Sequence, residues 1–174
     1  MKTNIYVLLA LIVFSACGKT TPDALITATI NGHATNFNVS AQAVTSAITI
    51  YKGKFVSVSG YNSNNDSEEV TIRIADSILT PGKMYFCIPD STYFNVSVSF
   101  KDASGTTYSN YRADVSQPNL PAQAVITSIT SNHIKGTFSA TLEAKAGGNT
   151  NISITNGTFD LPLTYTGDTS LPWK

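Results

Sequence analysis

The sequence predicts an all-β domain: an antiparallel β-sandwich of about ten to twelve strands, with a closed, lipocalin-like meander β-barrel as the alternative. Three observations support this fold class. Apolar residues alternate with Ser, Thr and Asn along much of the chain, and short turn-forming motifs separate the alternating runs. The composition, with 8 Tyr, 8 Phe and abundant Thr, Ser, Val and Ile, is typical of strands.

The alternation is clearest at 70–74 (VTIRI), 94–100 (FNVSVSF) and 137–142 (TFSATL). Successive side chains of an extended strand point to opposite faces, so each segment presents one apolar face and one polar face. This pattern is typical of half-buried antiparallel strands. We expect such strands at 24–31, 34–39, 45–51, 54–61, 69–76, 83–88, 93–101, 106–112, 123–130, 134–145, 150–155 and 158–165.

Turn-forming motifs lie between these segments. Asn31-Gly32 and Asn156-Gly157 are each expected to form a hairpin turn, because both residues accept the positive φ that a type I′ turn requires. Residues 102–105 and 147–149 are expected to form further hairpin breaks. The segment 41–47 could hold a short turn.

The N-terminus has the pattern of an export signal. Lys2 provides a positive charge, and an apolar run follows at 5–14. A run of about ten residues is half of what a helix needs to cross a bilayer, so it is interpreted as the core of a cleaved signal. Ser15-Ala16-Cys17 comes next. We expect a signal peptide at 1–16, a tether at 17–23 and a single all-β domain at 24–174.

Ser15-Ala16-Cys17 resembles the end of the bacterial lipobox, although Phe14 replaces its usual Leu. The resemblance implies that Cys17 receives a diacylglyceryl group and, after cleavage, an amide-linked chain such as palmitate. Two or more acyl chains anchor a protein stably. The expected location is therefore the outer membrane. In Bacteroidetes-type lipoproteins, an acidic cluster directly after the cysteine resembles a surface-export signal, and this chain has Lys19 with no acidic pair behind it. By that resemblance, the periplasmic face is favoured over the cell surface. The alternative is an ordinary secretory signal with a chance cysteine.

Charge and cysteine content narrow the function classes. Removing residues 1–16 leaves ten basic and eleven acidic residues, a net charge of −1. Such a balance argues against nucleic acid as a partner. Cys87, the second of the 2 cysteines, lies in an apolar strand-like segment and is expected to be a small buried hydrophobe.

The two ends of the mature chain carry a family resemblance. Residues 26–32 (ITATING), 136–139 (GTFS) and 154–160 (ITNGTFD) are similar to the "A-x-I-N-G" start and the "GTF…TNGxF" end of a Bacteroidetes lipoprotein family (DUF6252-like). The middle, 40–120, matches only in strand pattern. The resemblance implies the fold and the compartment. It implies no activity and no site residues.

No catalytic, cofactor or metal site is predicted. His33 and His133 lie a hundred residues apart at expected turns, without metal-ligand spacing. The chain has no Gly-x-Ser-x-Gly nucleophile motif. Paired acids of the glycosidase type are not excluded by spacing alone. However, most acids are expected at loops or strand ends, namely Asp66, Glu68, Glu69, Asp76, Asp90, Asp102 and Asp160.

The polar segment 62–69 (NSNNDSEE) loosely resembles a calcium loop, because oxygen-bearing side chains recur at every second residue. It lacks the central glycine and the closing glutamate of such loops. A polar hairpin loop is therefore the favoured interpretation.

Aromatic residues are the remaining binding candidates. Tyr108, Tyr111 and Trp173, together with Tyr51, Tyr61 and Tyr93, could form a stacking platform. The alternative is that they fill core edges with a solvated hydroxyl group. We therefore expect a non-catalytic module that binds a glycan, a peptide or a partner protein. A metal-independent polysaccharide hydrolase and a purely structural envelope lipoprotein are the alternatives.

Overall fold

A computed structural model describes residues 25–48, 53–62, 64–87, 95–111, 118–145 and 150–166. The expected signal peptide and Cys17 lie outside these residues, as do Tyr51, Tyr93 and Trp173. The described part is all-β, which confirms the predicted fold class. It contains no helix long and apolar enough to cross a membrane.

In the described ranges, eleven strands form one sheet with the order β2-β1-β11-β3-β4-β5-β7-β8-β10-β9-β6 and an additional β11–β10 pairing. Most neighbours are antiparallel, and β11 and β3 are parallel. The strands are β1 (Leu25–Ile30), β2 (His33–Asn36), β3 (Val39–Ile48), β4 (Gly53–Asn62), β5 (Asn65–Asp76), β6 (Met84–Cys87), β7 (Val96–Lys101), β8 (Thr107–Ser109), β9 (Ala122–Ile129), β10 (His133–Ala144) and β11 (Asn151–Tyr165).

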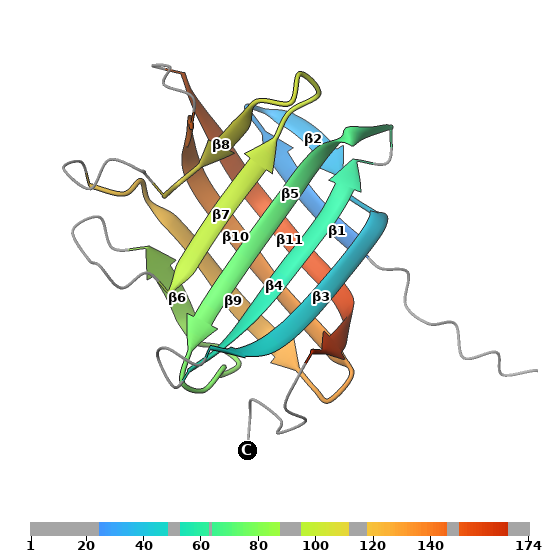
Figure 1. Cartoon of the computed structure of the whole chain (residues 1–174), viewed down its shortest axis with the longest axis vertical. Coiled ribbons are helices and arrows are strands. Elements are labelled where there is room, and N and C mark those ends of the chain that lie inside the picture. The colour runs from blue at the N-terminus through green and yellow to red at the C-terminus, as the bar shows by residue number, and fades with distance from the viewer. Residues whose placement is uncertain are drawn as a thin grey trace, which may run out of the picture.

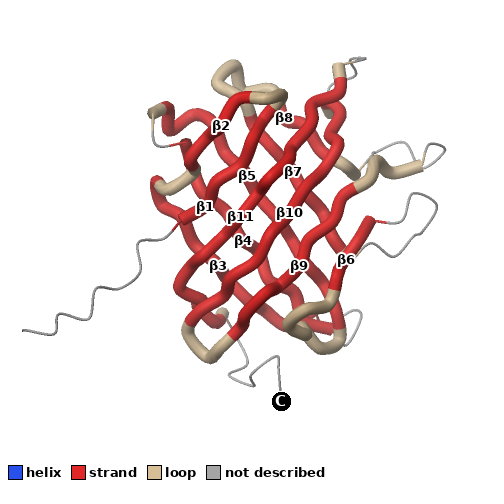
Figure 2. The backbone as a smooth tube through the Cα atoms, turned by 180° about the vertical axis from the view of Figure 1, so that it is seen from behind, coloured by secondary structure: helices blue, strands red, loops and turns tan. Residues whose placement is uncertain are grey.

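The sheet folds over into two layers that cross each other (Figure 1). We call β3, β4, β5, β7 and β8 the front layer. The rear layer, seen from behind in Figure 2, contains β2, β1, β11, β10, β9 and β6. The structure thus combines the two packed layers of a sandwich with the closed hydrogen-bonded ring of a barrel.

Two long strands join the layers. β10 pairs with β9 over 134–140 and then with β8 at 143–144. β11 pairs with β1 over 154–160 and then with β3 at 163–165. Each strand therefore starts or ends in one layer and passes into the other, as strands do at the corners of orthogonally packed sheets. Hydrogen bonds at these two corners close the ring.

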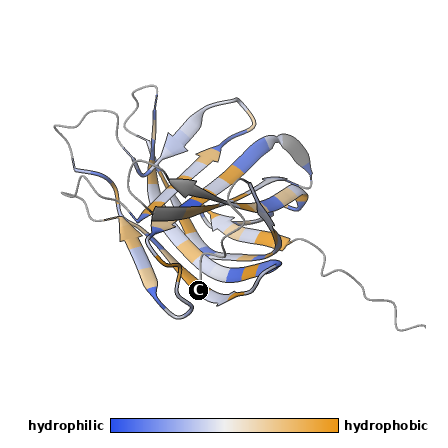
Figure 3. Ribbon diagram, turned by 60° about the horizontal axis from the view of Figure 1, so that its bottom comes forward, coloured by the Kyte–Doolittle hydropathy of each residue, from blue (hydrophilic) through white to orange (hydrophobic). Residues whose placement is uncertain are grey.

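The core lies between the layers because the alternating apolar residues point inward from both. Figure 3 shows hydrophobic and hydrophilic residues alternating along the strands. Phe37, in the β2–β3 connection, is fully buried and meets the Phe100 ring edge-on at 6.2 Å between centroids. The largest other fully buried side chains are Tyr85, Phe159, Ile26, Ile72, Ile74, Leu79, Ile126, Ile134, Leu142, Ile154 and Leu161.

The Asn31-Gly32 turn is confirmed. Ile30 pairs with His33, and the two loop residues have φ values of 47° and 87°. Positive φ at both positions is what a two-residue type I′ hairpin requires. The side-chain oxygen of Asn31 also accepts a hydrogen bond of 2.9 Å from the Ser153 amide, which ties the turn to β11.

The predicted turn at Asn156-Gly157 is wrong. A single strand, β11, runs through these residues. Asn156 does have a positive φ of 51°, but it forms a β-bulge, at which the register with β10 shifts between Phe138 and Ala140. A bulge places two residues opposite one and uses the same left-handed conformation as a turn. The Asn-Gly pair therefore indicated the positive φ correctly, but it did not indicate the end of a strand.

The short turn considered at 41–47 is also absent, because these residues belong to β3. The irregularity lies just before them. Ser40 has a φ of 49°, and the register with β4 shifts between Val39 and Gln42. The small residues in this segment thus accompany a second bulge.

Candidate functional site

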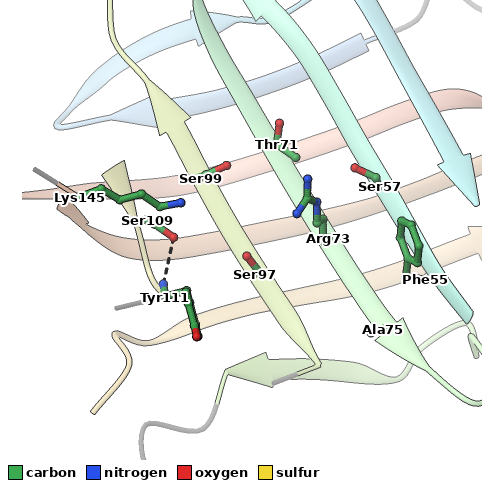
Figure 4. A pocket seen from close by; sticks show the side chains of 10 residues that line it. All are labelled: Phe55, Ser57, Thr71, Arg73, Ala75, Ser97, Ser99, Ser109, Tyr111 and Lys145. Atoms are coloured by element: carbon green, nitrogen blue, oxygen red, sulfur yellow. Dashed lines mark hydrogen bonds between the residues drawn. The ribbon is translucent and has the colours of Figure 1, made fainter. Parts of the chain in front are cut away.

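A depression of about 840 Å³ lies on the outer face of the front layer, away from the core. Figure 4 shows its ten lining side chains, which come from four neighbouring strands and from the end of β10. They are Phe55, Ser57, Thr71, Arg73, Ala75, Ser97, Ser99, Ser109, Tyr111 and Lys145. Two other described depressions, of about 410 and 540 Å³, lie on the rear layer and have no charged lining residue.

Sheet register arranges the hydroxyl groups of the depression in rows. In one row, Ser59, Thr71, Ser99 and Ser109 are successive cross-strand partners on β4, β5, β7 and β8. In the next row, Arg73 has Ser57 on one side and Ser97 on the other. Neighbouring strands are about 4.8 Å apart, so each row is a ladder of short polar side chains at regular spacing.

Aromatic residues lie at opposite ends of the depression. Phe55 projects from β4, and Tyr111, a residue that is 40% exposed, follows β8 (Figure 4). The backbone amide of Tyr111 donates a hydrogen bond of 3.1 Å to the Ser109 hydroxyl, which fixes the chain where it leaves the strand.

Lys145 reaches the depression because β10 crosses from the rear layer to the front. Its backbone amide donates a hydrogen bond of 2.9 Å to the Thr107 carbonyl beside β8. Its side chain is directed towards Ser109 (Figure 4). The corner between the layers therefore places a cation beside the hydroxyl rows.

The charge of the depression is positive. Arg73 and Lys145 are its charged lining residues, and no Asp or Glu lines it. Two acids border it. Glu69 accepts a hydrogen bond of 3.3 Å from the Thr71 hydroxyl, and Glu143 is the cross-strand partner of Ser109.

Among the predicted aromatic residues that the structure describes, Tyr108 and Tyr111 do not share one site. Tyr108 packs at the edge of the core, and its ring stacks on Phe100 at 6.3 Å between centroids. Its hydroxyl group donates a hydrogen bond of 3.2 Å to Asp102. Burial and the Asp102 carboxylate raise the pKa of Tyr108 above its usual value. Tyr108 therefore fits the core-edge alternative, whereas Tyr111 lines the depression.

The sequence suggested that His133 is an exposed turn residue, and this prediction is wrong. It is the first residue of β10 and is half-buried, with its Nε2 atom 2.7 Å from Asp160 Oδ1. The other oxygen of Asp160 is 2.6 Å from Lys135 Nζ. Asp160 lies within β11 rather than at a strand end. Within the described ranges, no three His, Cys, Asp or Glu side chains are grouped to hold a metal ion.

The segment 62–69 forms a polar hairpin, as expected, with Asn62 paired to Asn65. The Asn62 side-chain amide donates a hydrogen bond to Glu68, and the Asn62 oxygen accepts one of 2.9 Å from the Asn64 amide. Cys87 is buried, also as expected.

The sequence did not single out Arg73, Ser97 or Ser99, which were interpreted as parts of solvated strand faces. Each is unremarkable within its own strand. A signal existed only for the pairing of Arg73 with Ser57, because β4 and β5 are consecutive strands and both residues belong to polar faces. The sequence alone could not place Lys145 at the depression, because its position depends on the corner at which β10 pairs with β8.

No family model, curated protein or solved structure matches this chain.

Proposed function

We propose that this chain is an outer-membrane lipoprotein, anchored through Cys17, whose all-β domain is a non-catalytic module that binds a glycan. The periplasmic face of the membrane is favoured for its location. The apolar run at 5–14 followed by Ser15-Ala16-Cys17 supports the anchor. The end motifs support membership of the Bacteroidetes lipoprotein family that they resemble.

The observation that carries the binding proposal is the depression of the front layer, with its hydroxyl rows between Phe55 and Tyr111. A sugar presents hydroxyl groups that donate and accept hydrogen bonds, and the Ser and Thr side chains of the rows can do both. It also presents apolar ring faces, which pack on aromatic side chains. Four strands hold these groups, so little ordering of the site is required on binding.

The position of the depression is compatible with a membrane anchor at Cys17. Leu25 begins β1 in the rear layer, whereas the depression faces outward from the front layer. Seven residues lie between Cys17 and Leu25, and the eight residue steps of a fully extended chain span at most about 28 Å. The tether would thus hold the domain close to the bilayer.

The hydrolase alternative needs two carboxyl groups about 5–10 Å apart in a cleft. No observation at the depression favours it, because none of the lining residues is acidic. A peptide or protein partner would use the same face through its exposed side chains.

The test is a glycan-array screen with the full-length chain in detergent, followed by calorimetry on each ligand found. Thr71→Val removes one hydroxyl group of the central row, and Thr137→Val makes the same change on the outer face of the rear layer. We expect Thr71→Val to weaken binding several-fold, because a hydrogen bond contributes about 1 kcal/mol. Thr137→Val should leave affinity unchanged.

Three results would contradict the proposal. They are an array without any bound glycan, a bound glycan whose affinity falls equally in the two variants, and turnover of a glycoside that is lost when one carboxylate is replaced. Mass spectrometry of the native N-terminus tests the anchor separately. An unmodified Cys17 would refute it.

A further inference from the structure

Besides its hydroxyl rows and aromatic residues, the depression contains two cationic side chains. Arg73 stands at its centre, exposed, on β5 (Figure 4). Its direct cross-strand neighbours are Ser57 and Ser97, which offer hydroxyl groups and no charge. Lys145 lies at the edge of the depression.

These two cations differ from Lys83 and Lys135. Lys83 is paired with Asp76, and Lys135 is paired with Asp160. Arg73 and Lys145 have no carboxylate partner among the described residues. Both cations therefore keep their charge available at a surface that no acidic side chain lines.

Two acids, Glu69 and Glu143, lie at the border of the depression and do not line it. Thr71, which lines the depression, donates its hydroxyl hydrogen bond along β5 to Glu69. Glu143 is the cross-strand partner of Ser109, and Ser109 is buried. A ligand over the two hydroxyl rows would thus meet a positive charge at its centre and another at one side.

A guanidinium group binds an anionic group such as a carboxylate through two parallel charge-assisted hydrogen bonds, and a neutral sugar lacks the negative charge that strengthens them. Resting on the glycan-binding function proposed above, we infer that the glycan is acidic. Arg73 binds an acidic group of the oligosaccharide over the middle of the front layer, Lys145 binds a second, and the hydroxyl rows bind the sugar hydroxyl groups between them.

The experiment is calorimetric titration of the full-length chain in detergent with matched ligands. A galacturonic acid oligomer carries carboxylates, and its methyl ester has the same backbone without charge. A sulfated galactan oligomer replaces carboxylate by sulfate, and poly-glutamate carries carboxylates without sugar. We expect the acid oligomer, the sulfated oligomer or both to bind at least about tenfold more tightly than the methyl ester and poly-glutamate, since charged hydrogen bonds contribute about 1.5–3 kcal/mol.

Variants identify the cation responsible. Arg73→Gln should reduce affinity for the acidic oligomer about tenfold and leave the affinity for its ester unchanged. Arg73→Lys, which keeps the charge but loses the paired donors, should lie between Arg73→Gln and the parent protein. Lys145→Gln should have a smaller effect. Lys135→Gln, which removes a lysine from the outer face of the rear layer, is the control and should have none.

The outcomes separate this inference from the function on which it rests. Equal affinity for the acid oligomer and its ester overturns the acidic specificity and leaves glycan binding intact. Equal binding of poly-glutamate, or an equal loss in Arg73→Gln and Lys135→Gln, also overturns it. If no oligosaccharide in the titrations or on the array binds, both proposals fail.

Discussion

Phe138 and Gly157 lie directly opposite each other on β10 and β11, with the phenylalanine ring occupying the space that a side chain at Gly157 would need. Gly136 and Phe159 have the same relationship in reverse. The tripeptide Gly-Thr-Phe occurs on both strands, at 136–138 and 157–159. Because the strands are antiparallel, each phenylalanine covers the other strand's glycine. This repeat is a cross-strand packing device.

Gly157→Ala is expected to lower the free energy of unfolding by about 1–3 kcal/mol, the usual cost of overpacking. A Cβ atom there would lie 2.6 Å from two ring atoms and from the backbone oxygen of Phe138. Urea unfolding measures the loss. The double variant with Phe138→Leu should recover part of it, since the smaller side chain relieves the ring contact. Strictly additive effects would show that the ring does not cause the strain.

Asn156 should tolerate glycine and reject a β-branched residue. Its φ of 51° is left-handed, which glycine adopts freely and which costs other residues roughly 1–2 kcal/mol. Asn156→Gly should change stability by less than about 0.5 kcal/mol, and Asn156→Val should cost about 1–2 kcal/mol. Thr155→Val, at the exposed neighbouring position, is the control. Equal stability of the two Asn156 variants in thermal unfolding would contradict the bulge.

The Asp102 carboxylate should make stability depend on pH in acid. The Ser104 hydroxyl, at 2.6 Å, is the first cause of its lowered pKa, and the Thr106 and Ser104 amides and the Tyr108 hydroxyl also donate to it. Because the folded pKa lies below the unfolded value of about 3.8, its contribution is complete above that value. The contribution is lost as pH falls through the folded pKa.

Replacing Asp102 by Asn should therefore cost about 1 kcal/mol at neutral pH and progressively less as the solution becomes more acidic. Ser104→Ala, which keeps the carboxylate, should retain more of the pH dependence. The measurement is urea unfolding over a series of acidic pH values. Parallel stability curves for the Asn variant and the parent protein would refute this role.

Cys87 should react with thiol reagents slowly in the folded protein. Burial raises the pKa of its thiol above the usual value, which reduces the reactive thiolate, and the Asn110 side chain lowers the pKa only in part. After unfolding, the processed lipoprotein should expose one reactive thiol, because the Cys17 thiol would carry the diacylglyceryl group. The unfolded Cys87→Ala variant should then expose no reactive thiol. Two thiols in the processed protein would show that Cys17 is free.

The fold class was predictable because a period of two depends only on strands having one buried face. Residues 70–74 and 137–142 show it directly, and both lie in the strands expected for them. The bulge at Asn156 was not predictable, since a positive φ serves a turn and a bulge equally well. The site was harder still. Tyr111 was identified by residue type, but Arg73 and Lys145 lie together only because a particular register and a particular corner place them there.

The position of β11 also determines when the protein can finish folding. This strand hydrogen-bonds to β1, β3 and β10, yet it is the last of the eleven to emerge during synthesis or export. Until it arrives, β1 has only β2 as a partner, and the ring cannot close. Pairing between residues more than a hundred positions apart is slow to form. The nascent chain therefore carries open strand edges, which are prone to aggregate, until β11 has been delivered.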